Sequence, residues 1–379
     1  MIKVIISGGG TGGHVFPAIA IANALKAKVS RIDILFIGAK GRLEMEKVPA
    51  AGYPIEGLSI SGFQRRLTMK NLSFPFKVMG SLLKARSIIS RFRPDVVVGV
   101  GGYASGPTLR MANMAGIPTL IQEQNSYPGV TNRLLAAKAS RICVAYPGLE
   151  KYFPADKIVL AGNPIRQDLV DLSGKKQEGQ TFFGLSGSKK TILVIGGSLG
   201  AGTINKAMKR WVEEGPVPDN IQLIWQTGKN YFEALKTELT SKECRLPAAD
   251  CRLLPFIDRM DLAYAAADLI ISRAGAIAIS ELCVAGKPVI LIPSPNVAED
   301  HQTRNAMALS AIQAALMIKD GDAEEMLGKT IMTLISDAGW QASLCGNIRK
   351  MAIPDAADKI AEEVIGLLPP EKRKEAHGS

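Results

Sequence analysis

A glycine, a short helix and a carboxylate follow one another within the stretch 272–305. Gly275 precedes a helix predicted over residues 276–285, which is built of small and apolar residues and ends before Gly286. The N–H groups at the start of such a helix, together with its dipole, suit a phosphate. Glu281 lies one to two turns into the helix, where a carboxylate can accept hydrogen bonds from a ribose diol. The alternative is an ordinary β-α-β unit with a solvated glutamate.

Three glycine-rich turns each come directly after a predicted strand and before a predicted helix. They are residues 8–13, 99–107 and 196–201. Backbone N–H groups in two such turns can cradle a diphosphate without a charged side chain. After the second predicted strand stands Gly38-Ala39-Lys40, which lacks the acidic residue of NAD sites. This absence counts against an NAD-dependent oxidoreductase.

The recurrence of strand, glycine turn and helix predicts an α/β protein with two Rossmann-like domains. A length of 379 residues agrees with this, since domains average roughly 150 residues. We expect a first domain over residues 1–166, a linker over 167–190 and a second domain over 191–352, followed by a terminal helix and a charged, disordered tail over 353–379. Ligands of open α/β sheets bind beyond the carboxyl ends of the strands, so we expect them in a cleft between the domains.

The net charge of +11 is concentrated in one segment. Residues 57–94 contain eight Lys and Arg residues and no Asp or Glu, whereas the rest of the chain has 38 basic residues against 35 acidic ones. In this segment apolar residues interleave with basic residues that recur every seven positions; the residues concerned are Phe74, Phe76, Met79, Leu82, Lys77, Lys84 and Arg91. The pattern fits either a core helix with a solvated basic face or a face that docks on an anionic membrane. Nucleic acid is disfavoured because no nucleic-acid-binding motif accompanies the charge.

Other compositional features bound the cellular setting. The sequence has no apolar run of ~18 residues that could span a membrane, and the apolar run at Met1–Ser7 is too short for a signal peptide. The five cysteines do not have metal-ligand spacing. We therefore expect reduced thiols in a cytosolic protein without a metal site.

Six motifs, in order and spread over nearly the whole chain, resemble the MurG family of bacterial glycosyltransferases, which belongs to glycosyltransferase family 28. They are GGGTGGHVFPA, GVGGYASGP, QEQNSYPG, GNPIR, GGSLGA and SRAGAIAISE with the later GKPVILIP. The resemblance implies the GT-B fold, in which two Rossmann-like domains face across a cleft. It implies an inverting transfer, without metal or other cofactor, of GlcNAc from UDP-GlcNAc to the C4 hydroxyl of MurNAc in lipid I. The product would be lipid II for peptidoglycan synthesis.

The resemblance also implies a location and a set of substrate contacts. The enzyme would lie peripherally on the cytoplasmic face of the inner (plasma) membrane, with the segment 74–93 against the lipid. Ser198 would hold the α-phosphate, Ile257 would meet uracil through its backbone, and Gln302 would bind the GlcNAc hydroxyls. The other contacts would be Thr11, Gly12, Gly13 and Asn125 near the sugar and the reaction centre, Arg166 after the Asn-Pro turn, and Ala276, Ile277, Ala278, Ile279, Ser280 and Glu281 at the diphosphate and ribose.

An inverting transfer needs a base close to the acceptor hydroxyl. His14 follows the first glycine turn and is the first candidate; the other histidines are His301 and His377, the latter in the tail. Alternatively, His14 only hydrogen-bonds the turn or the substrate. Glu123 is the second candidate base. His301 departs from the glutamine that the family often has at that position, so no sugar contact is carried over to it.

Two other functions stay open at this point. A UDP-GlcNAc 2-epimerase has the same two-lobed fold and the same donor, but it needs no lipid acceptor, and the basic and apolar segment 63–92 argues against it. A non-catalytic, membrane-docked nucleotide-binding protein would bind UDP without turnover.

Overall fold

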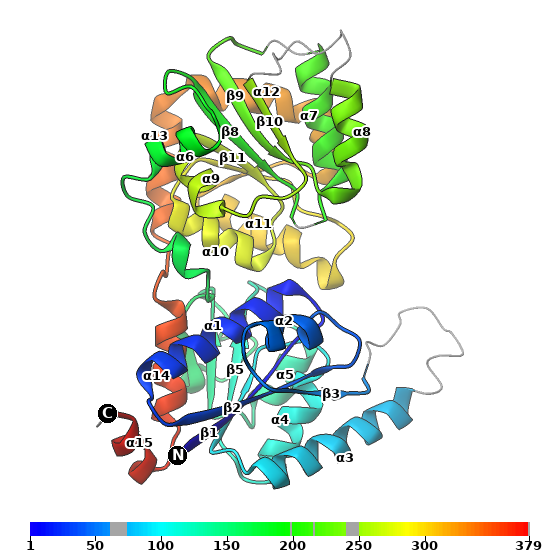
Figure 1. Cartoon of the computed structure of the whole chain (residues 1–379), viewed down its shortest axis with the longest axis vertical. Coiled ribbons are helices and arrows are strands. Elements are labelled where there is room, and N and C mark those ends of the chain that lie inside the picture. The colour runs from blue at the N-terminus through cyan, green and yellow to red at the C-terminus, as the bar shows by residue number, and fades with distance from the viewer. Residues whose placement is uncertain (61–73, 198, 215–216, 240–249, 378–379) are drawn as a thin grey trace. The chain divides into compact units, whose positions relative to one another are not determined.

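The computed structural model describes the whole chain except residues 61–73, 198, 215–216, 240–249 and 378–379. The chain divides into two compact units (Figure 1). Unit 1 comprises residues 1–165 and 354–379, and unit 2 comprises residues 166–353. Each unit contains one parallel β-sheet, as the recurring strand, turn and helix pattern predicts.

Unit 1 is built on a seven-stranded sheet in the order β3-β2-β1-β4-β5-β6-β7. The strands are β1 (Ile2–Ser7), β2 (Ile32–Ala39), β3 (Ile55–Leu58), β4 (Val96–Gly99), β5 (Thr119–Glu123), β6 (Arg141–Val144) and β7 (Ile158–Leu160). The helices that accompany it are α1 (Gly12–Lys28), α2 (Glu44–Ala50), α3 (Phe74–Phe92), α4 (Ser105–Met114), α5 (Val130–Ala136), α14 (Ala356–Gly366) and α15 (Pro370–His377).

The sheet of unit 1 is buried on both faces, which explains its continuous apolar strands. Alternate residues of β1 enter different clusters: Val4 and Ile6 pack with α1 and α14, whereas Ile5 packs with the helices on the other face. In the second cluster Ala85, Ile88 and Ile89 of α3 are buried with Leu109 of α4. Helices packed on both faces therefore fix the carboxyl ends of β1 and β4, where the glycine turns begin.

Unit 2 is built on a six-stranded sheet in the order β10-β9-β8-β11-β12-β13. The strands are β8 (Lys190–Ile195), β9 (Ile221–Gln226), β10 (Cys251–Leu254), β11 (Leu269–Ser272), β12 (Val289–Leu291) and β13 (Leu316–Met317). The helices are α6 (Lys176–Phe182), α7 (Gly202–Glu214), α8 (Lys229–Leu239), α9 (Met260–Ala266), α10 (Ala276–Ala285), α11 (His301–Ala311), α12 (Ala323–Ser336) and α13 (Ala338–Arg349). A short 3-10 helix covers Gln167–Leu169.

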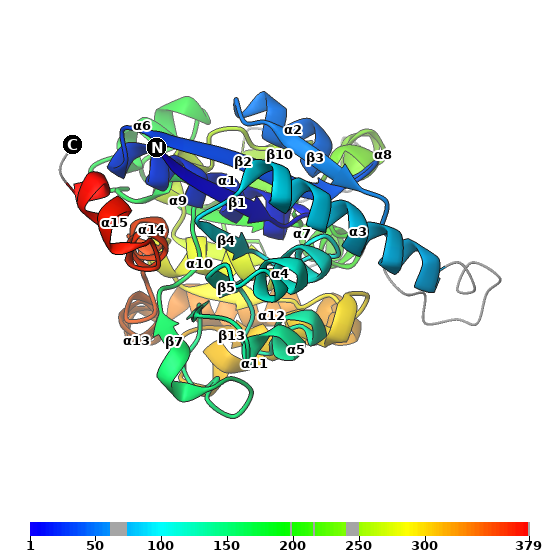
Figure 2. The ribbon, with the colours of Figure 1, turned by 90° about the horizontal axis from the view of Figure 1, so that it is seen from below.

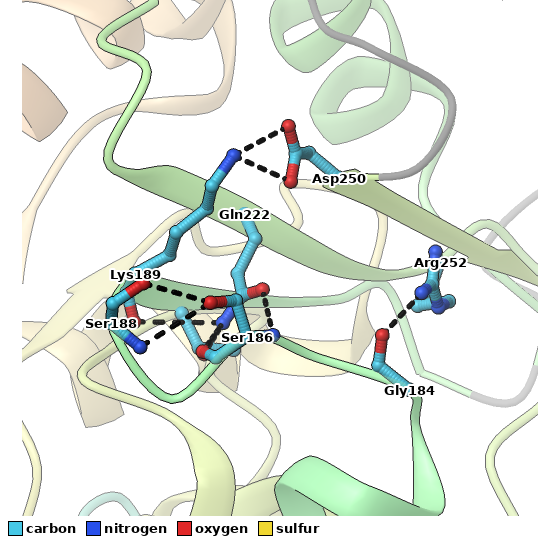
Figure 3. Close-up of polar contacts among 8 residues, drawn as sticks. Gly184, Ser186, Ser188, Lys189, Gln222, Asp250 and Arg252 are labelled. Atoms are coloured by element: carbon cyan, nitrogen blue, oxygen red, sulfur yellow. Dashed lines mark hydrogen bonds and ion pairs between the residues drawn. The ribbon is translucent and has the colours of Figure 1, made fainter.

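Residues 167–190, which the sequence suggests as a linker, instead fold as part of unit 2. Helix α6 packs closely on α9, since a Cβ added at Gly179 would lie 2.4 Å from the carbonyl oxygen of Leu262. The following segment is held against the sheet (Figure 3): Ser186 N–H donates to Oε1 of Gln222 over 2.8 Å, and Lys189 Nζ lies 2.8 Å from the carboxylate of Asp250. Its polar composition reflects an exposed position and not independence from the fold.

The C-terminal residues, expected as a helix followed by a disordered tail, return to unit 1 and remain ordered through α15. Figure 2 shows α14 and α15 beside one another, and α14 packs on α1. Lys372 pairs with Asp95 over 2.7 Å, and the N-terminal amine of Met1 pairs with Glu375 over 3.1 Å. These ion pairs and the burial of Ala376 hold the charged segment in place.

Candidate active site

The first two glycine turns of unit 1 pack directly on one another. Gly9, Gly10, Gly101 and Gly102 all have positive φ values, between +83° and +149°. A Cβ on Gly102 would lie 2.1 Å from the carbonyl oxygen of Gly9, so only glycine allows the two turns to approach this closely. The turns that follow β1 and β4 are therefore in direct backbone-to-backbone contact.

His14 lies in the first turn of α1, which begins at Gly12. Its Nδ1 is 3.3 Å from the hydroxyl oxygen of Thr11. Thr11 is exposed, and His14 is partly buried. The ring also lies against the second glycine turn, because a Cβ on Gly101 would be 2.9 Å from its Nε2. The two glycine turns thus fix one imidazole between them.

Glu123 ends β5 with both carboxylate oxygens already engaged. Oε1 accepts hydrogen bonds from the N–H and the side-chain amide of Asn125, over 3.0 and 3.2 Å. Oε2 accepts from Gly129 N–H over 3.1 Å and from Nδ2 of Asn132 over 2.8 Å. Burial raises the pKa of this carboxyl, and the hydrogen bonds from Asn132 and the loop N–H groups oppose the shift. The carboxylate orders the loop after β5 and orients Asn125.

Glu44, the first residue of α2, belongs to no motif of the sequence but contacts the first glycine turn. Its side chain is buried under the first glycine turn, and its carboxylate accepts hydrogen bonds from Gly10 N–H over 2.8 Å and from Ala39 N–H over 2.9 Å. The sequence did offer one signal for this contact, because Glu44 is an acidic residue shortly after β2. It lies beyond Gly38-Ala39-Lys40, where NAD sites have their acidic residue. Only the fold brings it to Gly10.

In unit 2 the turn that follows β8 packs on the turn that follows β9. Gly200 and Gly228 have φ values of +79° and +85°. A Cβ on Gly200 would lie 1.9 Å from the carbonyl oxygen of Thr227. Nε2 of Gln226 also donates to the carbonyl oxygen of Gly197 over 3.0 Å. Ser198, expected at the α-phosphate, lies outside the described residues.

Helix α10 has the bounds that the sequence predicts, with Gly275 as its N-cap and Gly286 as its left-handed C-cap. Gly275 has no side chain to occupy the first N–H groups, and Ala276, Ile277 and Ala278 are only partly buried. Of the remaining helix residues expected at the donor, Ile279 is buried in the core, whereas Ser280 is partly exposed and donates to the carbonyl oxygen of Ala276 over 3.2 Å. The start of α10 therefore has the geometry of an anion site.

Glu281 is buried in unit 2 between a buried tyrosine and an exposed arginine. Its Oε1 lies 3.2 Å from Nε of Arg166, and its Oε2 accepts a hydrogen bond from the hydroxyl of Tyr264 over 3.1 Å. Burial raises the pKa of the Glu281 carboxyl, and the charge of Arg166 opposes the shift. Two residues expected to contact the sugar donor, Arg166 and Glu281, thus contact each other, and Tyr264 also binds Glu281.

Asp320 connects two segments that lead into the expected diphosphate site. Its Oδ2 accepts a hydrogen bond from the hydroxyl of Thr203, in the first turn of α7, over 3.0 Å. Its Oδ1 pairs with Arg273, which lies between β11 and α10 and also donates to the carbonyl oxygen of Ile292 over 2.9 Å. One carboxylate therefore sets the spacing between the starts of α7 and α10.

Gln302 lies in the first turn of α11, and its Oε1 accepts a hydrogen bond from Ser294 N–H over 2.9 Å. This contact leaves the NH₂ group of the amide as the end that can donate to a sugar hydroxyl. Two non-glycine residues with positive φ, Glu299 and Asp300, precede the helix. Nε2 of His301 lies 3.7 Å from the carboxylate of Glu299, so His301 is turned toward its own loop. Ile257 has a buried side chain, which suits a contact through its backbone.

Helix α3 carries an apolar stripe on its exposed face. Phe76, Met79 and Leu83 are 81%, 58% and 61% exposed, whereas Ala85 and Ile88 are buried against unit 1. Two of the three regularly spaced basic residues of α3 contact strand β3. Lys84 donates to the carbonyl oxygen of Gly57 over 3.0 Å, and Arg91 pairs with Glu56. Lys77 is exposed and Leu82 half-buried, while the side chain of Phe74 lies outside the described residues. Within the part of the chain that the structure covers, helices are too short or too polar to cross a bilayer.

Comparisons with known proteins agree with this architecture. The sequence matches the glycosyltransferase family 28 N-terminal domain over residues 4–144 and the glycosyltransferase family 28 C-terminal domain over residues 191–360. A curated relative from Parabacteroides distasonis, named UDP-N-acetylglucosamine--N-acetylmuramyl-(pentapeptide) pyrophosphoryl-undecaprenol N-acetylglucosamine transferase, is 55% identical over 366 residues, which cover 97% of this chain and 98% of the relative.

Two solved structures place the fold. MurG from Acinetobacter baumannii is similar with a TM-score of 0.79 and 29% identity, over 96% of this chain and 99% of that one. UDP-GlcNAc 2-epimerase from Neisseria meningitidis has a TM-score of 0.67 at 14% identity, over 97% and 100% of the two chains, and shows a shared fold alone. The expected GT-B fold is confirmed. With matching domains over most of both units and more than half of its residues identical to a full-length relative, the chain belongs to glycosyltransferase family 28, in its MurG branch.

Proposed function

We propose that this chain transfers GlcNAc from UDP-GlcNAc to the C4 hydroxyl of MurNAc in lipid I, with inversion at the anomeric carbon, and so makes lipid II. The observation that carries the proposal is the 55% identity to a transferase of that name over 97% of this chain. Identity at this level extends through both units, whereas the epimerase is 14% identical. The epimerase, which shares the fold and the donor but needs no lipid acceptor, is therefore the weaker alternative.

Unit 2 is our candidate for the donor site. The start of α10 and the glycine turn before α7 would bind the diphosphate through N–H groups, which also stabilise the negative charge of departing UDP. Glu281 would bind the ribose diol. Its contact with Arg166 uses only the Nε–H of that side chain, and a guanidinium has further N–H donors for a phosphate oxygen. Gln302 would donate to the GlcNAc hydroxyls, and Ile257 would meet uracil through its backbone.

His14 is our candidate for the base that accepts the proton of the acceptor hydroxyl. When Nδ1–H donates to the Thr11 hydroxyl, 3.3 Å away, Nε2 is the basic nitrogen of the ring. Thr11, Gly12 and Gly13 precede it in the same turn and would lie beside the transferred sugar.

Glu123 fits a positioning role better than that of a base. Its two oxygens together accept three hydrogen bonds from the loop after β5 and one from Asn132 of α5. A proton taken up by this carboxylate would have to replace one of these contacts. We therefore assign Glu123 to the orientation of Asn125, which would contact the GlcNAc.

The exposed stripe of α3 supports a peripheral location at the cytoplasmic face of the inner membrane. An exposed apolar row on a helix that also carries Lys77 and Arg86 suits an anionic lipid surface, with the apolar side chains in the interface. Lipid I is itself held in the membrane by its lipid chain. Docking through α3 would therefore bring unit 1 to its acceptor.

The test is transfer of labelled GlcNAc from UDP-GlcNAc to a short-chain lipid I analogue, with EDTA present. We expect a β1→4-linked product that forms at the same rate with and without EDTA. A labelled donor that binds but is never transferred would support the non-catalytic nucleotide-binding protein. Conversion of the donor alone to its 2-epimer would support the epimerase.

A further inference from the structure

We propose that Glu44 is a positioning residue, which holds the first glycine turn in the conformation that presents His14 and prevents this turn from binding an anion. The inference deepens the proposed function and rests on it, because it assigns the base to the turn that Glu44 holds.

The carboxylate of Glu44 occupies a backbone N–H of the first glycine turn that could otherwise bind an anion. The residue is 1% exposed, and each of its oxygens accepts one backbone N–H, that of Gly10 over 2.8 Å and that of Ala39 over 2.9 Å. Space for the side chain comes from two glycines: a Cβ on Gly9 would lie 2.2 Å from Cδ of Glu44, and a Cβ on Gly38 would lie 2.5 Å from its Cγ.

This arrangement changes what the first turn can do. A free glycine turn offers its N–H groups to phosphate, but here the N–H of Gly10 already faces a carboxylate. A second anion would meet like charge at a buried site. The first turn therefore acts in catalysis by orientation, and nucleotide binding falls to unit 2.

The turn is also short enough for the hydrogen bond to Gly10 to fix His14. The residues between them include Thr11, whose hydroxyl lies 3.3 Å from Nδ1 of His14 and whose carbonyl oxygen accepts the His14 N–H over 3.1 Å. Displacement of Gly10 would move both contacts of the imidazole. Errors of about 1 Å in the position of a catalytic group can cost about 100-fold in rate.

The decisive variant is Glu44→Gln, which keeps the size of the side chain. One amide oxygen can still accept an N–H, but the NH₂ group must then face the other N–H, donor against donor. We expect kcat to fall at least ~10-fold with the KM for UDP-GlcNAc within about twofold of wild type. The amides of residues 8–14 should also exchange hydrogen faster, a readout that does not depend on activity.

Asp95→Asn is the matched control. The Asp95 carboxylate is also largely buried in unit 1 and also binds backbone, since it accepts the N–H of Lys3 over 2.8 Å. It directly precedes β4 and contacts the start of β1, away from the glycine turn, and it pairs with Lys372. We expect a lower Tm, an unchanged kcat below the Tm, and wild-type hydrogen exchange at residues 8–14.

The outcomes separate the inference from the proposed function. A wild-type kcat in Glu44→Gln, or a fall in kcat that Asp95→Asn matches at equal loss of Tm, overturns the role of Glu44. Absence of transfer by the wild type overturns the proposed function, and hydrogen exchange in Glu44→Gln then decides whether Glu44 holds the turn. If Glu44→Gln does not fold, Glu44→Asp, which is too short to reach both N–H groups, is measured in the same way.

Discussion

The contacts of His14 and Glu123 decide which of the two is the better candidate for the catalytic base. His14 and Glu123 are both in unit 1 and both could accept a proton by type alone. The carboxylate of Glu123 is buried with four hydrogen bonds, whereas His14 is partly exposed at the end of a glycine turn. A catalytic base must reach its substrate, and this difference favours the histidine.

Replacing His14 distinguishes a base from a residue that only forms hydrogen bonds. We expect His14→Ala to lower kcat by roughly 100-fold or more with little change in the donor KM, because general-base catalysis contributes about that factor. His14→Asn is the matched variant: its amide can replace the contact to Thr11 but cannot accept a proton. Equal losses in both variants are expected in steady-state transfer assays. Substantial activity in His14→Asn would reduce His14 to a hydrogen-bonding role.

Replacing Glu281 tests the ribose contact. We expect Glu281→Ala to weaken UDP binding by roughly 1–3 kcal/mol, or about 5- to 150-fold in Kd, because the diol loses its acceptors. Tyr264→Phe is the control, since it removes the 3.1 Å hydrogen bond to Glu281 but keeps the carboxylate. It should lower stability and leave the Kd for UDP within about twofold. Titration calorimetry that finds unchanged UDP affinity in Glu281→Ala would remove the diol assignment.

At the scale of elements, apolar runs bounded by turns were sufficient to predict most of the sheets. Strands end at Ser7, Gly99 and Ile195, where the three predicted glycine turns begin, and the helix at 276–285 has the predicted bounds. Helix propensity does not set the start of α1, because its first residues are Gly12 and Gly13, and glycine is a weak helix former. The packing of the two glycine turns decides it instead.

The exposed face of α3 yields a prediction about membrane binding. Phe76, Met79 and Leu83 recur at helical spacing and are more than half exposed, so their substitution should leave the fold of unit 1 intact. We expect the triple change to Ser to reduce sedimentation with vesicles rich in anionic lipid at least ~10-fold, while transfer to a water-soluble acceptor is kept. Serine substitutions of the buried Ile88 and Ile89 should instead lower the Tm. Unchanged vesicle binding by the triple variant would place the membrane contact elsewhere.

At the scale of the whole molecule, the sequence predicts two α/β units but not which residues complete them. The sequence predicts a terminal helix within 353–379, yet the partner of this helix, α14, is α1, more than 300 residues earlier. The contact of Glu44 with Gly10 and the group formed by Glu281, Arg166 and Tyr264 are likewise products of folding. No spacing rule connects such residues, so the motifs indicated the site and the fold supplied its supporting contacts.

The return of the C-terminus to unit 1 predicts how truncation divides the molecule. Ile360, Val364, Ile365 and Leu368 are buried in the cluster with α1. Burial of each such side chain contributes roughly 1.5–3 kcal/mol, and four together match the ~5–15 kcal/mol that stabilises a typical domain. We expect deletion of 354–379 to abolish the calorimetric transition of unit 1 and to expose it to protease, while unit 2 still binds UDP. Deletion of 370–379 is the control: it removes the Lys372–Asp95 ion pair but keeps α14, so it should shift that transition by only a few degrees. If the longer deletion also kept the unit 1 transition, then α14 would cover unit 1 without being needed for its folding.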